Sequence, residues 1–218
     1  MPYFNNISVL FIHIPKTGGT SVEKYFSSKY SIPLNNDSLY GTCKDINISL
    51  QHMTYNDIVT RCFKYTKKIQ PINSIYINKQ LEPNIKIITI VRNPYTRIVS
   101  DLFHFNLITI NSTKEQVYAI IINYTNTTNK FKYDNHNIPQ YNYILDDMNI
   151  VNPNIHIMKT ETLTEDMIKL GYTDFNIHEN TNKHNNNINY YNYFNQKSIM
   201  HINKIYKNDF EYFNYTIL

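Results

Sequence analysis

The chain has 218 residues, of which 42% are hydrophobic, and a formal net charge of +4. This length fits a single domain over residues 1–218 with a substantial buried core. The basic residues are scattered among Asn and Tyr, which argues against nucleic acid as a partner and favours small anionic ligands. The sequence has no apolar window of 18 residues and no basic segment before its first apolar run, so it predicts neither a membrane span nor a signal peptide. Cys43 and Cys62 have no metal-type spacing and leave the redox state open.

The first predicted unit is a strand, a glycine loop and a helix. Residues 8–14, SVLFIHI, form a nearly continuous apolar run, which is typical of a strand buried on both faces of a parallel sheet. Thr20 and Glu23 have the spacing of a capping box, so we expect the helix to begin there.

A second unit repeats this order of elements. Residues 86–91, KIITIV, predict another buried strand. Asn93 can cap the helix that follows, and Pro94 suits its first position.

Further elements alternate in the same way. Residues 54–57 resemble a capping box that opens a helix to about residue 65, and a strand over 155–158 precedes a helix over 164–170 that Gly171 closes. Strands that alternate with helices indicate a three-layer α/β fold with a central, mainly parallel sheet flanked by helices.

Two stretches are less regular. Beyond an expected helix at KEQVYAIIINY, residues up to 140 predict an exposed loop on the substrate side, and the Asn-rich residues 176–195 predict another. The apolar residues of 197–213 recur at helical spacing, so we expect one final helix that packs on the sheet.

The glycine loop is suited to an anion, because a helix N-terminus offers free N–H groups and the positive end of the helix dipole. Its candidate ligands are Lys16, Thr17, Gly18, Gly19, Thr20 and Ser21. A Walker A loop places its lysine after the glycines, whereas Lys16 precedes them. A P-loop kinase that uses ATP is therefore a disfavoured alternative.

HIPKTGGTS and VRNPYTRIVSDLF together resemble the two signature motifs of sulfotransferases that use 3′-phosphoadenosine 5′-phosphosulfate (PAPS), in particular the carbohydrate branch with heparan sulfate 2-O-sulfotransferase-like proteins. The segments SLQHMTY, HIMKTETLTEDM and the C-terminal helix extend this resemblance over most of the chain. It implies a P-loop-like fold and transfer of a sulfuryl group from PAPS to a hydroxyl, with a glycan as the favoured acceptor and 3′,5′-ADP as product. Because no anchor is predicted, a cytoplasmic location is favoured over the Golgi.

The resemblance also implies roles for individual residues. Lys16 would contact the 5′-phosphosulfate and stabilise the charge that develops on the leaving phosphate. Arg92 and Ser100 would bind the 3′-phosphate, a task that suits the planar guanidinium. His52 is the favoured base for the acceptor hydroxyl, and His104 is the alternative candidate for the base.

Other polar residues receive secondary interpretations. Asn180 and Lys183 are candidates for a nucleotide contact, and Gln140 and Tyr143 for the acceptor side. Arg97 and His13 are interpreted as structural residues. No metal is expected, since no histidine spacing suggests a site. A noncatalytic nucleotide- or glycan-binding relative stays open as an alternative to an enzyme.

Overall fold

The computed structural model describes residues 3–4, 7–35, 39–43, 46–65, 84–127, 130–176 and 189–218. Within them, the main sheet has the strand order β1-β2-β5-β6. These strands are β1 (Tyr3–Phe4), β2 (Val9–Ile12), β5 (Lys86–Val91) and β6 (Ile155–Lys159). The strands β2, β5 and β6 pair in parallel, and β1 adds antiparallel to β2. A separate hairpin joins β3 (Thr42–Cys43) and β4 (Ile48–Ser49).

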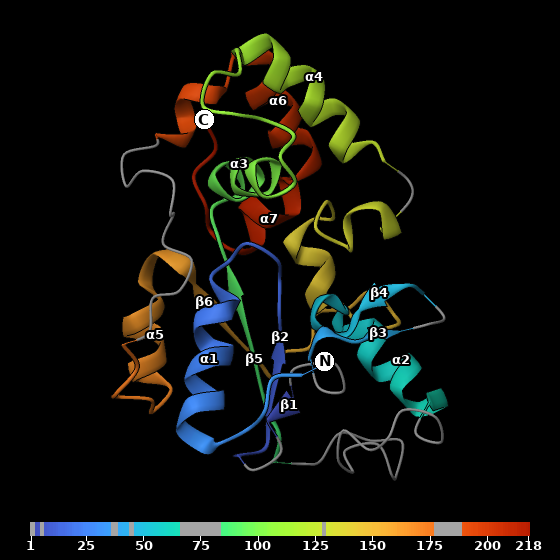
Figure 1. The fold of residues 1–218 in the computed structure, drawn as a ribbon, viewed down its shortest axis with the longest axis vertical. Helices are drawn as coiled ribbons and strands as arrows, with labels where there is room; N and C mark the ends of the chain where they lie inside the picture. The colour runs from blue at the N-terminus through green and yellow to red at the C-terminus, as the bar shows by residue number, and fades with distance from the viewer. Residues whose placement is uncertain are drawn as a thin grey trace.

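Helices cover both faces of the main sheet, as Figure 1 shows. Helices α1 (Gly19–Tyr30) and α5 (Leu163–Lys169) lie on one side, and α2 (Tyr55–Tyr65) lies on the other. Alternate residues of β2 enter different cores: Val9 and Phe11 pack with α1 and α5, whereas Leu10 and Ile12 pack with α2. This is the expected three-layer α/β fold with a mainly parallel sheet.

A third apolar cluster lies beyond the end of the sheet where β5 leads into α3 (Pro94–His104). It joins α3 to α4 (Lys114–Thr125), α6 (Gln196–Ile205) and α7 (Lys207–Tyr212). The predicted single helix over 197–213 was therefore wrong in two respects. The helix is interrupted at Tyr206, and its buried residues Ile202, Tyr206 and Phe210 pack on α3 and α4, while Phe213 reaches the core beside the sheet.

Several sequence predictions are confirmed in detail. The strand over 86–91 has the expected bounds. Thr54 and Asp57 form a reciprocal capping box, and the Asn93 side chain accepts from the N–H of Tyr95 at the start of α3. Gly171 has a φ of 96° just after α5, the left-handed conformation in which glycine commonly ends a helix.

Short 3-10 helices connect the larger elements: η3 (Leu50–His52), η4 (Lys130–Tyr133), η5 (Gln140–Ile144), η6 (Thr160–Thr162) and η7 (Tyr190–Tyr193). The expected exposed loop before residue 140 was wrong in part, because Asn135, His136 and Asn137 are buried. None of the helices in the described ranges has the length and apolar character needed to cross a bilayer. The assignment of residues 1–218 to one domain stays a prediction.

Candidate active site

The loop between β2 and α1 lies at the end of the sheet that faces α3 (Figure 1). Lys16 has a φ of 64° and Gly18 a φ of 90°, and this left-handed region is uncommon for residues other than glycine, asparagine and aspartate. Gly18 is the N-cap of α1, none of the residues that the structure describes caps this helix with its side chain, and the first turn has no acidic residue. The predicted capping box at Thr20 and Glu23 was therefore wrong. The uncapped first turn favours an anion.

The two sequence motifs are joined by hydrogen bonds at this loop. Arg92 Nη1 donates to the carbonyl oxygen of Lys16 at 3.2 Å, and Arg97 Nε donates to that of Pro15 at 3.1 Å. The Thr160 hydroxyl lies 2.6 Å from the carbonyl oxygen of Thr17 and 3.1 Å from that of Val91. Because β2 and β5 are parallel neighbours, their carboxyl ends bring the motifs together.

Within the loop, the candidate ligands differ in environment. Thr17 is fully buried, and its hydroxyl donates to the carbonyl oxygen of Ile14 at 2.8 Å. Ser21 is buried and its N–H donates to the carbonyl oxygen of Gly18 at 3.0 Å, whereas Lys16, Gly18 and Thr20 are half-buried. The Thr17 hydroxyl therefore maintains the shape of the loop.

Gln140 holds the backbone of Arg92 at the end of β5. Its Oε1 accepts from the N–H of Arg92 and its Nε2 donates to the carbonyl oxygen, both at 2.8 Å. Gln140 and Tyr143 are fully buried, so the prediction that they line the acceptor side was wrong. Ser100 is half-buried on α3, and in the described part of the chain Arg92 Nε donates instead to the Thr96 hydroxyl at 3.1 Å.

Burial lowers the pKa of Lys16, and the charge of Arg92 lowers it further, while the Asp101 carboxylate opposes both. Asp101 is 1% exposed, and burial raises its own pKa to about 6. The half-buried Lys16 side chain thus lies in a region that already contains the guanidinium groups of Arg92 and Arg97, and Asp101 balances this positive charge only in part. An anion in the loop would relieve this imbalance.

His52 lies at the end of η3, and its Nδ1 is 2.6 Å from Asp134 Oδ2. Burial alone would raise the pKa of Asp134, but hydrogen bonds from His52 and Ser49 hold it well below its ordinary value. An ionised carboxylate only accepts, so the proton of neutral His52 is on Nδ1 and Nε2 has the free lone pair. Burial lowers the pKa of His52, and the Asp134 hydrogen bond opposes this effect.

Four histidine rings follow one another beside the loop. The centroids are 5.5 Å apart for His13 and His52, 4.7 Å for His52 and His136, and 5.3 Å for His136 and His104. His136 Nδ1 contacts Asp101 at 2.7 Å, and His13 Nδ1 contacts Glu23 at 2.5 Å. His104 is the exposed member and stacks parallel on His136.

The sequence interpretation missed the carboxylates and one of these histidines. Asp134 and His136 fall in the stretch that was expected to be an exposed loop, and Glu23 was taken for a helix cap. A run of Asp, Asn and His inside that polar stretch was the available signal, but its burial depends on contacts distant in sequence. Arg97 was interpreted correctly: it is buried and donates to three backbone carbonyl oxygens. Asn180 and Lys183 lie outside the described residues.

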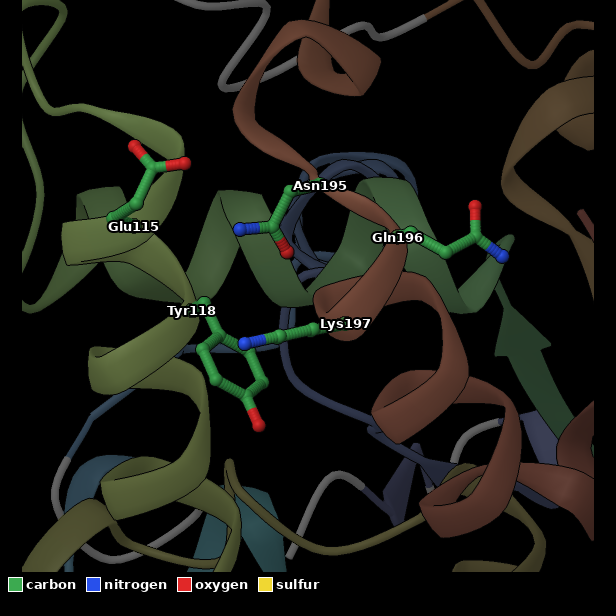
Figure 2. A pocket seen from close by; sticks show the side chains of 5 residues that line it. All are labelled: Glu115, Tyr118, Asn195, Gln196 and Lys197. Atoms are coloured by element: carbon green, nitrogen blue, oxygen red, sulfur yellow. The ribbon is translucent and has the colours of Figure 1, made fainter.

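A surface pocket of about 330 Å³ lies elsewhere, between the first turns of α4 and α6 (Figure 2). Its lining residues are Glu115, Tyr118, Asn195, Gln196 and Lys197. None of them belongs to either motif, so this hollow is separate from the loop. In the described ranges, no group of three or more His, Cys, Asp or Glu side chains is arranged to hold a metal ion.

Comparison with known proteins supports one family. Neither the curated proteins nor the solved structures gave a significant match to this sequence. The model of the sulfotransferase family matches residues 3–216, which include the loop, both strand-to-helix junctions and every residue of the histidine row. With nearly the whole chain matched and a parallel α/β fold around the loop, this protein belongs to the sulfotransferase family.

Proposed function

We propose that this chain transfers a sulfuryl group from PAPS to a hydroxyl of a glycan and releases 3′,5′-ADP. The observation that carries the proposal is the joining of the two motifs: Arg92 donates to the backbone of Lys16 while the His52–Asp134 pair lies near the same loop. Phosphate-binding groups at both ends of a nucleotide and a base for the acceptor are the parts that this reaction needs.

The loop residues fit an anionic donor. PAPS supplies the sulfuryl group and a leaving phosphate, which Lys16 would stabilise with N–H groups of residues 17–20 and the hydroxyls at positions 20 and 21. Thr17, Gly18, Gly19, Thr20 and Ser21 surround the uncapped start of α1, where the helix dipole favours negative charge. Arg92 and Ser100 would hold the 3′-phosphate.

His52 is the proposed base. With its Nδ1 proton bound to Asp134, Nε2 is free to take the proton of the acceptor hydroxyl as that oxygen attacks sulfur. His104 is the weaker candidate, because it is exposed and its described ring contacts are with His136 and Phe105. The glycan acceptor is proposed from the resemblance of both motifs to the carbohydrate branch.

Calorimetry with 3′,5′-ADP and with ATP-Mg²⁺ tests the donor site. We expect metal-independent binding of 3′,5′-ADP, weakened about 10- to 100-fold by Arg92→Ala through the loss of charged hydrogen bonds. Lys169→Ala is the matched control, since the Lys169 side chain is 75% exposed on α5. Preference for ATP-Mg²⁺ would favour the kinase alternative.

The catalytic assignment needs a separate assay. Sulfate transfer from PAPS to a panel of glycans, tyrosine peptides and small alcohols should detect a glycan product in the wild type, and His52→Ala should abolish most of the rate. Binding of 3′,5′-ADP without transfer to any acceptor would favour the noncatalytic alternative.

A further inference from the structure

The His13 ring fills the space beside Gly19, within the anion loop. A Cβ atom added to Gly19 would lie 2.7 Å from His13 Nε2 and 2.8 Å from both Cδ2 and Cε1. These are distances that real Cβ contacts essentially never show, so the imidazole occupies the space that any other side chain at position 19 would need. The His52 ring lies on the same histidine, at 5.5 Å between centroids and nearly perpendicular. His13 is therefore packed between the loop and the proposed base.

The orientation of His13 is fixed from α1. Nδ1 lies 2.5 Å from Glu23 Oε1, and Gln51 Nε2 donates to Glu23 Oε2 at 2.8 Å. Glu23 is 1% exposed, so this carboxyl is held inside the protein. A carboxylate in that position accepts the Nδ1 proton, and Nε2 of the same ring faces Gly19 at the start of α1.

The Nε2 atom of His13 remains available. Within the described part of the chain, the polar contacts of His13 are made by Nδ1, which donates to Glu23 and lies 2.9 Å from Gln51 Nε2. His13 as a whole is only 4% exposed, so its Nε2 lies in a nearly dry position. A hydrogen-bond donor in such a nearly dry position acts more strongly than one in water.

We propose that His13 is a second catalytic residue, whose Nε2 donates a hydrogen bond to a sulfuryl oxygen of the donor, with Glu23 as its positioning residue. This rests on the proposed function: the sulfuryl group must pass between the leaving phosphate in the loop and the hydroxyl at His52, and His13 touches both borders of that region. This role requires a proton on both nitrogens, because a neutral ring that donates Nδ1–H to Glu23 has only a lone pair at Nε2. The Nε2–H group would then point to the sulfuryl group, whose charge distribution changes during transfer.

Two substitutions of His13 distinguish a direct contact with the sulfuryl group from a purely structural role. The amide of His13→Asn can replace Nδ1 as donor to Glu23 but leaves nothing at Nε2, whereas the amide of His13→Gln reaches toward the position of Nε2. The probes are PAPS and 3′,5′-ADP, which differ by the sulfuryl group. The control is His156→Asn, because His156 is exposed on β6.

We expect His13→Asn to weaken PAPS binding about 10- to 100-fold, as for one charge-assisted hydrogen bond, and to leave 3′,5′-ADP binding unchanged. Transfer should fall by about 10²- to 10³-fold, and His13→Gln should restore part of both losses. Equal weakening of both ligands by His13→Asn, or no effect on PAPS, would overturn the role of His13 while leaving the proposed function standing.

A spectroscopic measurement on the wild type covers the case in which the variants do not fold. In ¹⁵N-histidine spectra, PAPS should shift the Nε2 resonance of one buried histidine that 3′,5′-ADP does not shift. Binding of PAPS with no such shift would contradict the contact. A wild-type chain that binds neither ligand would instead overturn the proposed function.

Discussion

Asp134 determines which nitrogen of His52 has a proton, because its ionised carboxylate accepts from Nδ1 at 2.6 Å. Ser49 donates to the same carboxylate from its backbone N–H and its hydroxyl, both at 2.7 Å. These contacts fix the orientation of the carboxylate. The chemistry proposed for one residue thus depends on a residue that is 82 positions away in the chain.

Asp134→Asn should reduce transfer by about 10²- to 10⁴-fold, because the amide no longer fixes the tautomer with Nε2 as acceptor. Asp134 also raises the pKa of His52, against the larger lowering by burial. Its removal should therefore move the acid limb of the kcat/KM profile to lower pH, while 3′,5′-ADP binding stays unchanged. A pH profile that does not move would contradict this pairing. Asp174→Asn is the control, since the Asp174 side chain is 58% exposed and pairs with Lys29.

At the scale of elements, the start of α1 depends on a close approach between helix and strand. Gly19 is the first residue of α1, and its missing side chain makes room for His13, which directly follows β2. Glycine at this position is thus explained by the packing of His13 and not by backbone conformation, in contrast to Gly18 with its φ of 90°.

Gly19→Ala should destabilise the protein by about 1–3 kcal/mol, as overpacking of a buried site does. In a His13→Ala background the same change should be neutral or stabilising, because the clash is gone and the helix propensity remains. Urea denaturation of the four proteins measures the coupling. Additive effects of the two substitutions would show that the ring moves aside freely.

At the scale of the whole molecule, the site lies where the three-layer α/β unit meets the cluster of α3, α4, α6 and α7. The loop comes from the edge between β2 and α1, Arg92 from the end of β5, and Asp134 and His136 from the segment after α4. Arg97 joins these parts, since its buried guanidinium donates to carbonyl oxygens of Pro15, His136 and Ile138.

The positive charge at the proposed donor site comes from side chains and the N-terminus of α1. We therefore expect sulfuryl transfer to be independent of divalent metal. Lys16, Arg92 and the first turn of α1 converge on the loop. Dialysis against EDTA should leave the transfer rate and the affinity for 3′,5′-ADP unchanged, as measured by the same assay and calorimetry. A loss that added Mg²⁺ restores would favour phosphoryl-transfer chemistry of the kinase type.

The sequence by itself determined the parallel α/β architecture and the two motifs, because each depends on local patterns. Apolar runs of strand length, the cap at Asn93 and the order of lysine and glycines are all read within a few residues. From these, Lys16, Arg92 and the position of His52 before a capped helix could be predicted.

Only the tertiary structure decided the surroundings of those residues. The sequence suggested that Glu23 caps a helix, but in the structure its carboxyl makes a buried contact with His13. Asp134 and His136 were expected in an exposed loop, but their segment packs against α3 and η5 and contacts His52 and Asp101. The physical reason is that a hydrogen bond between distant residues gains its strength from burial, and burial is a property of the assembled layers. Local patterns identify the groups that can act, while the fold decides which partner orients each of them.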